Sequence, residues 1–338
     1  MKIARFHRKQ EVPSRARLGV VLETGVVGDL GAAYAHLLGQ KRGDLQAAEI
    51  AALRIPADLA RLLAGGPFAR SALNEAARHL VELSAQGLSA TGLDGAPLFA
   101  SLSDCRLAPP LVPGKILAVG RNYGAHLAEM GSKQPFKIPS AWIKATSCMT
   151  GPFDDVVKPR ATEKLDYETE LSVVIAERCK NVPEDRAYDV IFGYVIVNDV
   201  SARDVARLER AEGNQLLNKM FDGFAPTGPW VVTRDEVPDP MNLGLRTRVN
   251  GEIRQDGSTS GMVWSIPKLV AFLSQMTLEP GDVITTGTPG GVAAGRSPEL
   301  PSWFLKPGDV VESEIERIGT MRNRIIDPPA EEKVSWQW

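Results

Sequence analysis

The chain has 338 residues and nearly balanced charge, with 39 basic and 41 acidic side chains and a formal net charge of −2. This balance excludes the strongly basic surface that wraps nucleic acid, and no apolar run approaches the length of a membrane span. The cysteines Cys105, Cys148 and Cys179 are too far apart for a disulfide framework or a Cys-x-x-Cys metal site. We therefore expect a soluble, cytoplasmic protein with reduced thiols, no nucleic-acid partner and no membrane partner.

Two domains are expected, a small α+β domain over residues 1–108 and a larger domain over residues 109–338. Abundant glycine (31) and proline (24) favour many turns and a β-rich fold. The prolines between residues 107 and 114 would interrupt any continuing element, which indicates a linker. In the smaller domain, aliphatic runs at 3–6 and 17–22 predict paired strands. Alanine- and leucine-rich periodicity predicts helices at 44–63 and 69–83.

A short apolar run ending at Gly120 predicts a strand, and a helical turn is expected to follow it as far as Gly131. His126 and Glu129 are three residues apart, so a helix places them side by side. A carboxylate beside an imidazole orients the ring and raises its basicity, which suits a general base that activates water. By itself, the same spacing is also typical of an ordinary surface pair.

The segment 166–175 carries the strongest chemical signal. Its second half is rich in β-branched residues and predicts a strand that enters a core. Glu168 and Glu170 are two residues apart, so on a strand both carboxylates project from one face. Two buried like charges need a counter-ion, and hard divalent cations prefer carboxylate oxygens. The alternative is an amphipathic strand with both acids in solvent.

A third carboxylate favours the metal site over that alternative. The apolar run 194–197 ends in Asn198 and Asp199, and a helix is predicted to follow with Ser201 as its N-cap. Asp199 at the end of a buried strand would complete a three-oxygen site with Glu168 and Glu170. Arg203 in the first helical turn opposes the helix dipole, so it is expected to face an anion.

Three later segments are also distinctive. Lys219 lies in a loop, where a lone lysine is usually solvated. Asn250-Gly251 between two alternating runs predicts a hairpin, and Ser265 is expected to cap a helix that extends to Met276. A glycine- and threonine-rich loop at 285–292 follows.

Five strings, in order, resemble the fumarylacetoacetate hydrolase superfamily, and in particular its acylpyruvate hydrolase and 2-hydroxyhepta-2,4-diene-1,7-dioate isomerase branch. They are Gly-Arg-Asn-Tyr-x-x-His-x-x-Glu, Glu-x-Glu, Ser-Ala-Arg-Asp, Lys-x-Phe-Asp and Thr-Gly-Thr-Pro-x-Gly-Val. The resemblance implies an α+β, β-rich mixed β-roll with peripheral helices, preceded by the small N-terminal domain and assembled as a homodimer. One departure stands out, because relatives commonly carry glutamine where this chain has Ala206.

The resemblance also implies roles for individual residues. A divalent metal ion, Mg²⁺ with Mn²⁺ or Ca²⁺ as alternatives, would bind Glu168, Glu170 and Asp199. Three residues would be catalytic, namely His126, Glu129 and Lys219, and Lys219 would stabilise a developing enolate or a substrate carboxylate. Five residues would contact the substrate, namely Arg121, Tyr123, Arg203, Gln255 and Thr288. The Thr288 hydroxyl and neighbouring backbone amides could hold a carboxylate.

Three functions are consistent with these residues. The first is a metal-dependent hydrolase that cleaves a C–C bond in a diketo acid of the acylpyruvate or fumarylpyruvate kind, with water activated by His126 and Glu129. The second is an isomerase or decarboxylase of 2-hydroxy-diene-dioate or oxaloacetate-like 2-oxo acids in aromatic-acid catabolism. The third is a non-catalytic metal-binding assembly protein, against which the complete His–Glu pair argues.

Overall fold

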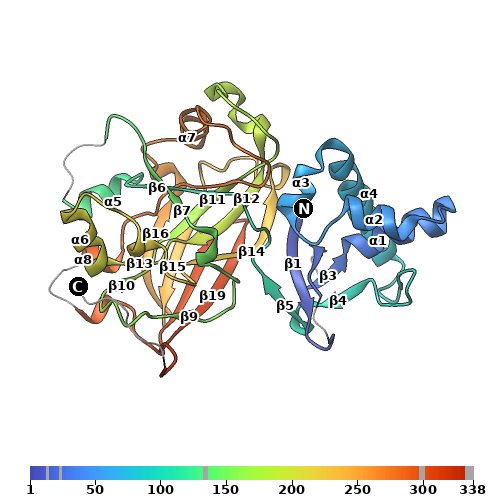
Figure 1. Ribbon diagram of the computed structural model, residues 1–338, viewed down its shortest axis with the longest axis horizontal. Helices are drawn as coiled ribbons and strands as arrows, with labels where there is room; N and C mark the ends of the chain where they lie inside the picture. Colours follow the sequence, from blue (N-terminus) through green and yellow to red (C-terminus); the bar gives the residue numbers. More distant parts are fainter. Residues whose placement is uncertain (13–14, 23–24, 132–135, 297–300, 332–338) are drawn as a thin grey trace.

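The computed structural model describes residues 1–12, 15–22, 25–131, 136–296 and 301–331 (Figure 1). Strands dominate the larger part of the molecule, and most helices lie at the periphery, which confirms the expected α+β, β-rich class. No helix in these ranges combines the length and apolar character needed to cross a bilayer.

The largest sheet in these ranges has twelve strands. Ten follow one path in the order β4-β3-β2-β1-β14-β12-β11-β17-β6-β7, while β5 pairs with β1 and β8 pairs with β14. Their bounds are β1 Lys2–Arg8, β2 Arg17–Val21, β3 Val26–Asp29, β4 Phe99–Ser101, β5 Cys105–Ala108, β6 Ile116–Gly120, β7 Ser140–Lys144, β8 Met149–Thr150, β11 Thr169–Ile175, β12 Ile191–Asn198, β14 Ala225–Thr233 and β17 Val283–Thr285. The antiparallel pairing of β1 with β2 is the one predicted.

A five-stranded sheet packs against the middle of the main sheet. It has the order β16-β15-β18-β19-β9, and β10 and β13 form a separate pair. The bounds are β9 Val156–Val157, β10 Leu165–Asp166, β13 Ser201–Ala202, β15 Gly244–Val249, β16 Glu252–Ser258, β18 Val310–Ile315 and β19 Gly319–Ile326. Leu171 and Tyr194 of the main sheet share one buried cluster with Leu245 and Ile315 of the smaller sheet. The β15–β16 turn at Asn250-Gly251 has positive φ at both residues, as the hairpin prediction requires.

Helices cover both parts of the chain. In the N-terminal part these are α1 Leu30–His36, α2 Ala47–Arg54, α3 Leu59–Ala64 and α4 Gly66–Ala85, and in the larger part α5 Gly124–Glu129, α6 Arg203–Ala211, α7 Ile266–Leu273 and α8 Ala293–Arg296. The prediction of one helix over 44–63 is wrong, because the chain leaves the helix around Pro56, which has no N–H to donate. Helix α1 was not predicted, although Asp29 caps it by accepting from the backbone N of Ala32 at 3.0 Å.

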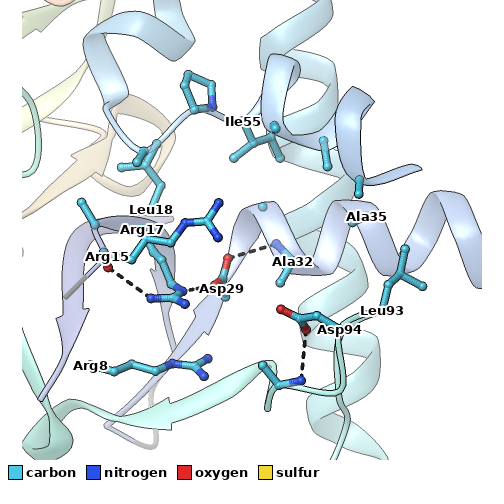
Figure 2. Close-up of a pocket in the computed structure, with 18 of the residues that line it drawn as sticks. Arg8, Arg15, Arg17, Leu18, Asp29, Ala32, Ala35, Ile55, Leu93 and Asp94 are labelled. Atoms are coloured by element: carbon cyan, nitrogen blue, oxygen red, sulfur yellow. Dashed lines mark hydrogen bonds and ion pairs between the residues drawn. The ribbon is translucent and has the colours of Figure 1, made fainter. Parts of the chain in front are cut away.

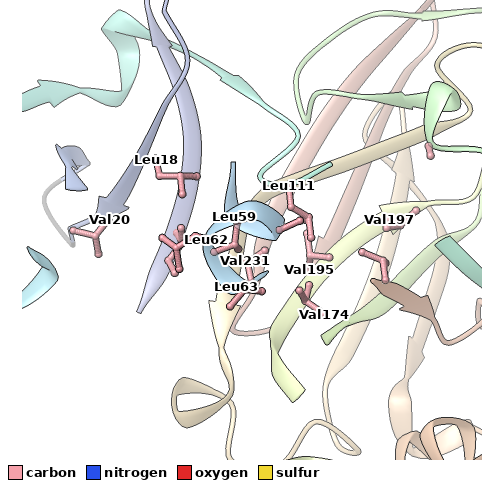
Figure 3. Close-up of a cluster of buried hydrophobic side chains, with 14 of the residues drawn as sticks. Leu18, Val20, Leu59, Leu62, Leu63, Leu111, Val174, Val195, Val197 and Val231 are labelled. Carbon is pink, nitrogen blue, oxygen red and sulfur yellow. The ribbon is translucent and has the colours of Figure 1, made fainter. Parts of the chain in front are cut away.

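The N-terminal part is joined to the rest by both sheet and core. β1 pairs with β14, with Lys2 opposite Val232 and Ile3 opposite Val231. Helix α3 lies at this junction, where its leucines belong to the same buried cluster as valines of β11, β12 and β14 (Figure 3). Burying apolar surface from both parts in one cluster couples their stabilities. The division of the chain into domains over residues 1–108 and 109–338 stays a prediction.

A cavity of about 310 Å³ lies between the sheet and helices of the N-terminal part (Figure 2). Arg17 projects into it and forms an ion pair with Asp29, with 2.9 Å between Nε and Oδ2. A second carboxylate, that of Glu11, accepts from Nη2 of Arg17 at 2.6 Å. Nη2 of Arg8 donates to the carbonyl oxygen of Pro97 at 2.5 Å. The arginines of β1 and β2 at this cavity thus have partners within the chain.

Candidate active site

Three carboxylates converge where two neighbouring strands of the main sheet begin and end. Glu168 immediately precedes β11 and Glu170 is the second residue of that strand, whereas Asp199 follows the last residue of β12. Thr169 is paired with Asn198, so these strand ends lie side by side. One oxygen of each carboxylate lies within 4.8 Å of the others, and all three side chains are buried. We refer to Glu168, Glu170 and Asp199 as the acidic triad.

Backbone and amide hydrogen bonds hold the triad in place. The Glu168 backbone N donates to Oδ1 of Asn198 at 2.9 Å, and the Asp199 backbone N donates to the carbonyl oxygen of Glu168 at 2.8 Å. Gly287, in the predicted glycine- and threonine-rich loop, donates its N–H to Oε2 of Glu170 at 2.9 Å. The carboxylates are therefore oriented by the rigid part of the fold before any ligand binds.

Two predicted cations contact the triad. Nζ of Lys219 lies 2.7 Å from Oδ2 of Asp199 and also donates to Glu168. Arg203 bridges Oδ2 of Asp166, 2.8 Å from its Nε, and Oε1 of Glu168. The expectation that Arg203 faces an anion agrees with this geometry. Ser201 does not cap α6, however, because it lies in the short strand β13 and its hydroxyl donates to the carbonyl oxygen of Asp199.

The two glutamates of the triad have opposite electrostatic environments. Burial opposes ionisation of Glu168, but Lys219 and Arg203 hold the pKa of its carboxyl well below the usual range. Burial raises the pKa of Glu170 well above the usual range, and repulsion from Asp199 and Glu168 adds to this effect. Lys219 and Arg203 therefore balance the negative charge of Glu168. The repulsion between Glu170 and its two acidic neighbours is not balanced in the same way.

This donor set fits a hard divalent cation. Carboxylate oxygens are the preferred ligands of Mg²⁺, Mn²⁺ and Ca²⁺. A cation placed among the three oxygens would relieve the repulsion that raises the pKa of Glu170. The triad is the only group of three or more His, Cys, Asp or Glu side chains within the described ranges whose ligand atoms approach this closely. Glu168, Glu170 and Asp199 are thus the residues that would hold the ion.

The predicted His–Glu pair is formed at the same site. Helix α5 places Nδ1 of His126 at 2.8 Å from Oε1 of Glu129. The other oxygen of Glu129 accepts from the backbone N of Gly291 at 2.7 Å, which fixes the carboxylate from the opposite side. With Nδ1 engaged, Nε2 is the ring nitrogen left to exchange a proton with a ligand.

A cavity of about 560 Å³ connects these groups. Two triad members line it, Glu168 and Glu170. Five of the other predicted site residues also line it, namely Arg121, His126, Arg203, Lys219 and Thr288. The Thr288 hydroxyl donates to the carbonyl oxygen of Thr169 at 2.9 Å, so its position is tied to β11. Aromatic and apolar side chains, Trp142 and Leu127 among them, also line the cavity.

Two predicted substrate contacts do not line this cavity. Gln255 is fully buried, and its Nε2 donates to the Thr288 hydroxyl at 2.8 Å while its Oε1 accepts from the Thr247 hydroxyl at 2.6 Å. Tyr123 is also buried and lines a neighbouring cavity that Glu129 shares. Gln255 was predicted on a strand and Tyr123 in the segment after Gly120. The sequence does not show which way either side chain points. Gln255 supports Thr288 instead of facing the ligand space.

The structure adds functional candidates that the sequence analysis missed. Lys144 is fully buried at the end of β7, and its Nζ lies 2.9 Å from Oδ1 of Asp199. A lone lysine is normally solvated, so only its place in an otherwise apolar strand hinted at burial. Arg210 and Gln215, at the end of α6 and just after it, line the central cavity. Nothing in the charged pattern of α6 distinguishes Arg210 from its exposed neighbour Arg207.

Comparison with known proteins identifies the family of the larger part of the chain. Residues 115–326 match the family model described as Fumarylacetoacetate (FAA) hydrolase C-terminal. An uncharacterized protein from Archaeoglobus fulgidus is 44% identical over 226 residues, which cover 67% of this chain and 84% of that protein.

Two solved structures resemble nearly the whole chain. Maleylpyruvate hydrolase from Sphingobium sp. SYK-6, in complex with manganese(II) and pyruvate, is 28% identical with a TM-score of 0.67, and the match covers 97% of this chain and 99% of that chain. The 2-hydroxyhepta-2,4-diene-1,7-dioate isomerase from Mycobacterium marinum is 26% identical with a TM-score of 0.64, and covers 97% and 99%, respectively. The family model spans the triad, His126, Glu129 and Lys219. The chain therefore belongs to the fumarylacetoacetate hydrolase family, a family of enzymes.

Proposed function

We propose that this protein is a metal-dependent hydrolase that cleaves the C–C bond between the two carbonyl groups of a diketo acid of the acylpyruvate kind. The observation that carries the proposal is the contact of 2.8 Å between His126 and Glu129, because His126 lines the same cavity as Glu168 and Glu170 of the acidic triad. A hydrolase needs an activated water as well as a site for the 2-oxo acid, and this arrangement would supply both.

The acidic triad would hold the ion, for which we propose Mg²⁺, with Mn²⁺ or Ca²⁺ as alternatives. When bound, such an ion would supply Lewis acidity and a template for the carboxylate and 2-oxo oxygens of the substrate. Lys144 and Asn198 would keep the triad in position, because the first contacts Asp199 and the second accepts from the backbone N of Glu168.

His126 would act as the general base. Its Nε2 takes a proton from water while the water oxygen attacks the distal carbonyl carbon, and Glu129, which contacts Nδ1, stabilises the imidazolium that forms. The bond between that carbon and the neighbouring methylene then breaks, and the electron pair leaves with the methylene as an enolate. The ammonium of Lys219 would stabilise this negative charge, and the imidazolium returns the proton to carbon. The products are a carboxylic acid and a 2-oxo acid.

An isomerase or decarboxylase is the second candidate. The specific observation behind it is that the isomerase from Mycobacterium marinum resembles this chain about as closely as the maleylpyruvate hydrolase does. Both reactions use a bound 2-oxo acid and need no attacking water, so the His126–Glu129 pair is the feature that favours hydrolysis.

The test is turnover of 2,4-dioxopentanoate with Mg²⁺ or Mn²⁺. We expect loss of the ultraviolet absorbance of the diketo group, with acetate and pyruvate released in equal amounts and both abolished by a chelator. Release of CO₂ from oxaloacetate, or enol–keto exchange without cleavage of any 2,4-diketo acid, would replace the hydrolase with the second candidate. No metal-dependent turnover across a panel of 2-oxo acids would favour a non-catalytic metal-binding assembly protein. The same preparation, sized in solution, would test the proposed homodimer.

A further inference from the structure

A buried carboxylate on helix α6 lies outside the group of residues that would react. Glu209 is 7% exposed, and it shares the buried face of α6 with Val205 and Ala206. In the part of the chain that the structure describes, no lysine or arginine forms an ion pair with it, and N–H groups take the place of a cation. A buried charge of this kind needs several hydrogen bonds to offset the loss of its hydration.

These hydrogen bonds come from three successive residues of the loop after α6. Oε1 accepts from the backbone N of Leu217 at 2.7 Å, and Oε2 accepts from the backbone N of Leu216 at 3.1 Å and of Asn218 at 3.2 Å. The side-chain amide of Asn218 also donates to Oε2. The carbonyl oxygen of Glu209 accepts from the backbone N of Asn214 at 2.8 Å, so Glu209 binds the loop at two places.

Apolar packing does not account for the position of this loop. Leu216 and Leu217 are 47% and 41% exposed, whereas leucines that anchor a loop bury their side chains. The two residues that follow, Asn218 and Lys219, are buried. The segment therefore turns inward at the point where Glu209 holds its backbone N–H groups.

Lys219 is the residue that this turn brings into the central cavity. It ends a short 3₁₀ helix, and its backbone N donates to the carbonyl oxygen of Leu216 at 3.2 Å. Its carbonyl oxygen accepts from the buried ammonium of Lys144. The backbone of Lys219 is thus held on one side through the segment bound by Glu209 and on the other by Lys144, while its Nζ lies 2.7 Å from Oδ2 of Asp199.

We infer that Glu209 is a positioning residue for Lys219. It does not line the central cavity, and it acts by fixing the backbone from which the ammonium of Lys219 reaches the cavity. The inference rests on the proposed function, because it takes Lys219 to stabilise the enolate. A misplacement of about 1 Å between a catalytic group and the reacting atoms can cost about 10²-fold in rate. Since the enolate forms only after binding, the loss should appear in kcat more than in KM.

Glu209→Gln tests the inference with a side chain of the same shape. It replaces one acceptor oxygen by an amide group that can only donate, and that group would face the N–H groups of the loop. We expect kcat for 2,4-dioxopentanoate to fall about 10–100-fold while KM stays within about twofold. The kcat is counted per bound Mn²⁺, because a purely structural role would reduce the amount of folded protein without changing this value. An unchanged kcat at full occupancy would overturn the inference.

Combination with Lys219→Met shows whether Glu209 acts through that lysine. In the Lys219→Met background, Glu209→Gln should have almost no further effect on kcat. A loss that keeps its full size in that background would mean that Glu209 acts through another group. Glu212→Gln is the matched control, because it removes the charge of an exposed glutamate just after the same helix. This control should keep the wild-type kcat.

Two measurements without turnover separate this inference from the proposed function. In Glu209→Gln, the amides of residues 216–218 should exchange hydrogen faster than in the wild type, and acetic anhydride should acetylate Lys219 severalfold faster, as followed by mass spectrometry. Glu212→Gln should change neither rate. An unchanged rate of either kind in Glu209→Gln would reject the positioning role whatever reaction the enzyme catalyses. If Glu209→Gln does not fold, Glu209→Asp takes its place, because its shorter side chain cannot reach all three N–H groups.

Discussion

The N-terminal cavity and the central cavity both contain arginines, but only the second has the character of a reaction site. In the first, Arg17 is bound by Asp29 and Glu11 and Arg8 by a carbonyl oxygen, so these cations already have partners in the chain. In the second, the chain brings together three carboxylates, whose repulsion adds to the effect of burial on the pKa of Glu170, and two arginines, Arg121 and Arg210, that form no ion pair with any other residue the structure describes. Folding alone does not explain such an arrangement, whereas binding of a cation and an anionic substrate does.

This comparison predicts that the two cavities respond to mutation in opposite ways. Removing a charge from the N-terminal cavity should lower stability and leave activity intact. Removing Glu170 from the central cavity should abolish activity and relieve repulsion in the metal-free protein.

Glu170→Gln should abolish metal-dependent turnover, because it removes one of the three ligands. It should also eliminate the rise in Tm that Mn²⁺ produces in the wild type. Since the wild-type carboxylate is raised in pKa by burial and by its acidic neighbours, the metal-free variant should be at least as stable as the metal-free wild type at neutral pH. Wild-type affinity for Mn²⁺ in this variant, measured by calorimetry, would remove Glu170 from the ligand set.

Lys219→Met should lower kcat/KM by about 10²–10³-fold, because it removes the positive charge proposed to stabilise the enolate. The fold should persist, although Glu168 and Asp199 lose a partner, and circular dichroism in the presence of Mn²⁺ would check this. Lys268→Met is a suitable control, because Lys268 lies on α7 and does not line the cavity. An unaltered kcat/KM in Lys219→Met would exclude a catalytic role.

The stabilisation by Mn²⁺ should increase with pH. The pKa of Glu170 is raised on folding, so its contribution to the stability of the metal-free protein is present at low pH and is lost as the pH rises through that raised pKa. Mn²⁺ binds the ionised carboxylate and must compete with the proton at low pH. The rise in Tm should therefore be larger at about pH 8 than at about pH 5.5. An equal rise in Tm at the two pH values would contradict the role given to Glu170 in binding the ion.

Arg17→Gln should lower the free energy of unfolding by about 1–3 kcal/mol, because it leaves the mostly buried carboxylate of Asp29 without its cation. Urea unfolding would measure the loss. The kcat/KM of this variant should stay within about twofold of the wild type, since the N-terminal cavity contributes no group to the reaction. A large loss of activity at unchanged metal affinity would mean that the two cavities are coupled through the shared sheet.

The acidic triad could be predicted from sequence because its signal is local. Two glutamates spaced for one face of a strand, and an aspartate at the end of the next strand, converge in any antiparallel pairing that places Thr169 opposite Asn198. His126 and Glu129 were equally accessible, because a single helical turn sets their separation. The turn-rich composition indicated a β-rich fold, whereas the mixed β-roll with peripheral helices was implied by the resemblance to the family.

The remaining features depend on side-chain direction or tertiary contacts. Lys144 is separated from Asp199 by more than fifty residues, and no local pattern shows that its ammonium is buried against that carboxylate. Gln255 lies on a predicted strand, but whether it faces a ligand or supports Thr288 depends on the loop packed above it. Arg210 differs from Arg207 only in the face of α6 on which it lies. Pro56 could have indicated the break in the helix predicted over 44–63, but the alanine-rich periodicity on both sides of it favoured one continuous helix.

The proposed water activation is best tested by measuring two reactions in His126→Ala and Glu129→Gln. Each variant would be loaded with Mn²⁺ and its metal occupancy confirmed. Its hydrolysis of 2,4-dioxopentanoate would then be compared with enol–keto exchange of the same compound. We expect His126→Ala to lose about 10²–10⁴-fold in hydrolysis while still binding Mn²⁺ and oxalate. Glu129→Gln should lose nearly as much, and the double variant little more, since the pair acts as a unit. Hydrolysis that survives in His126→Ala at full metal occupancy would contradict the mechanism.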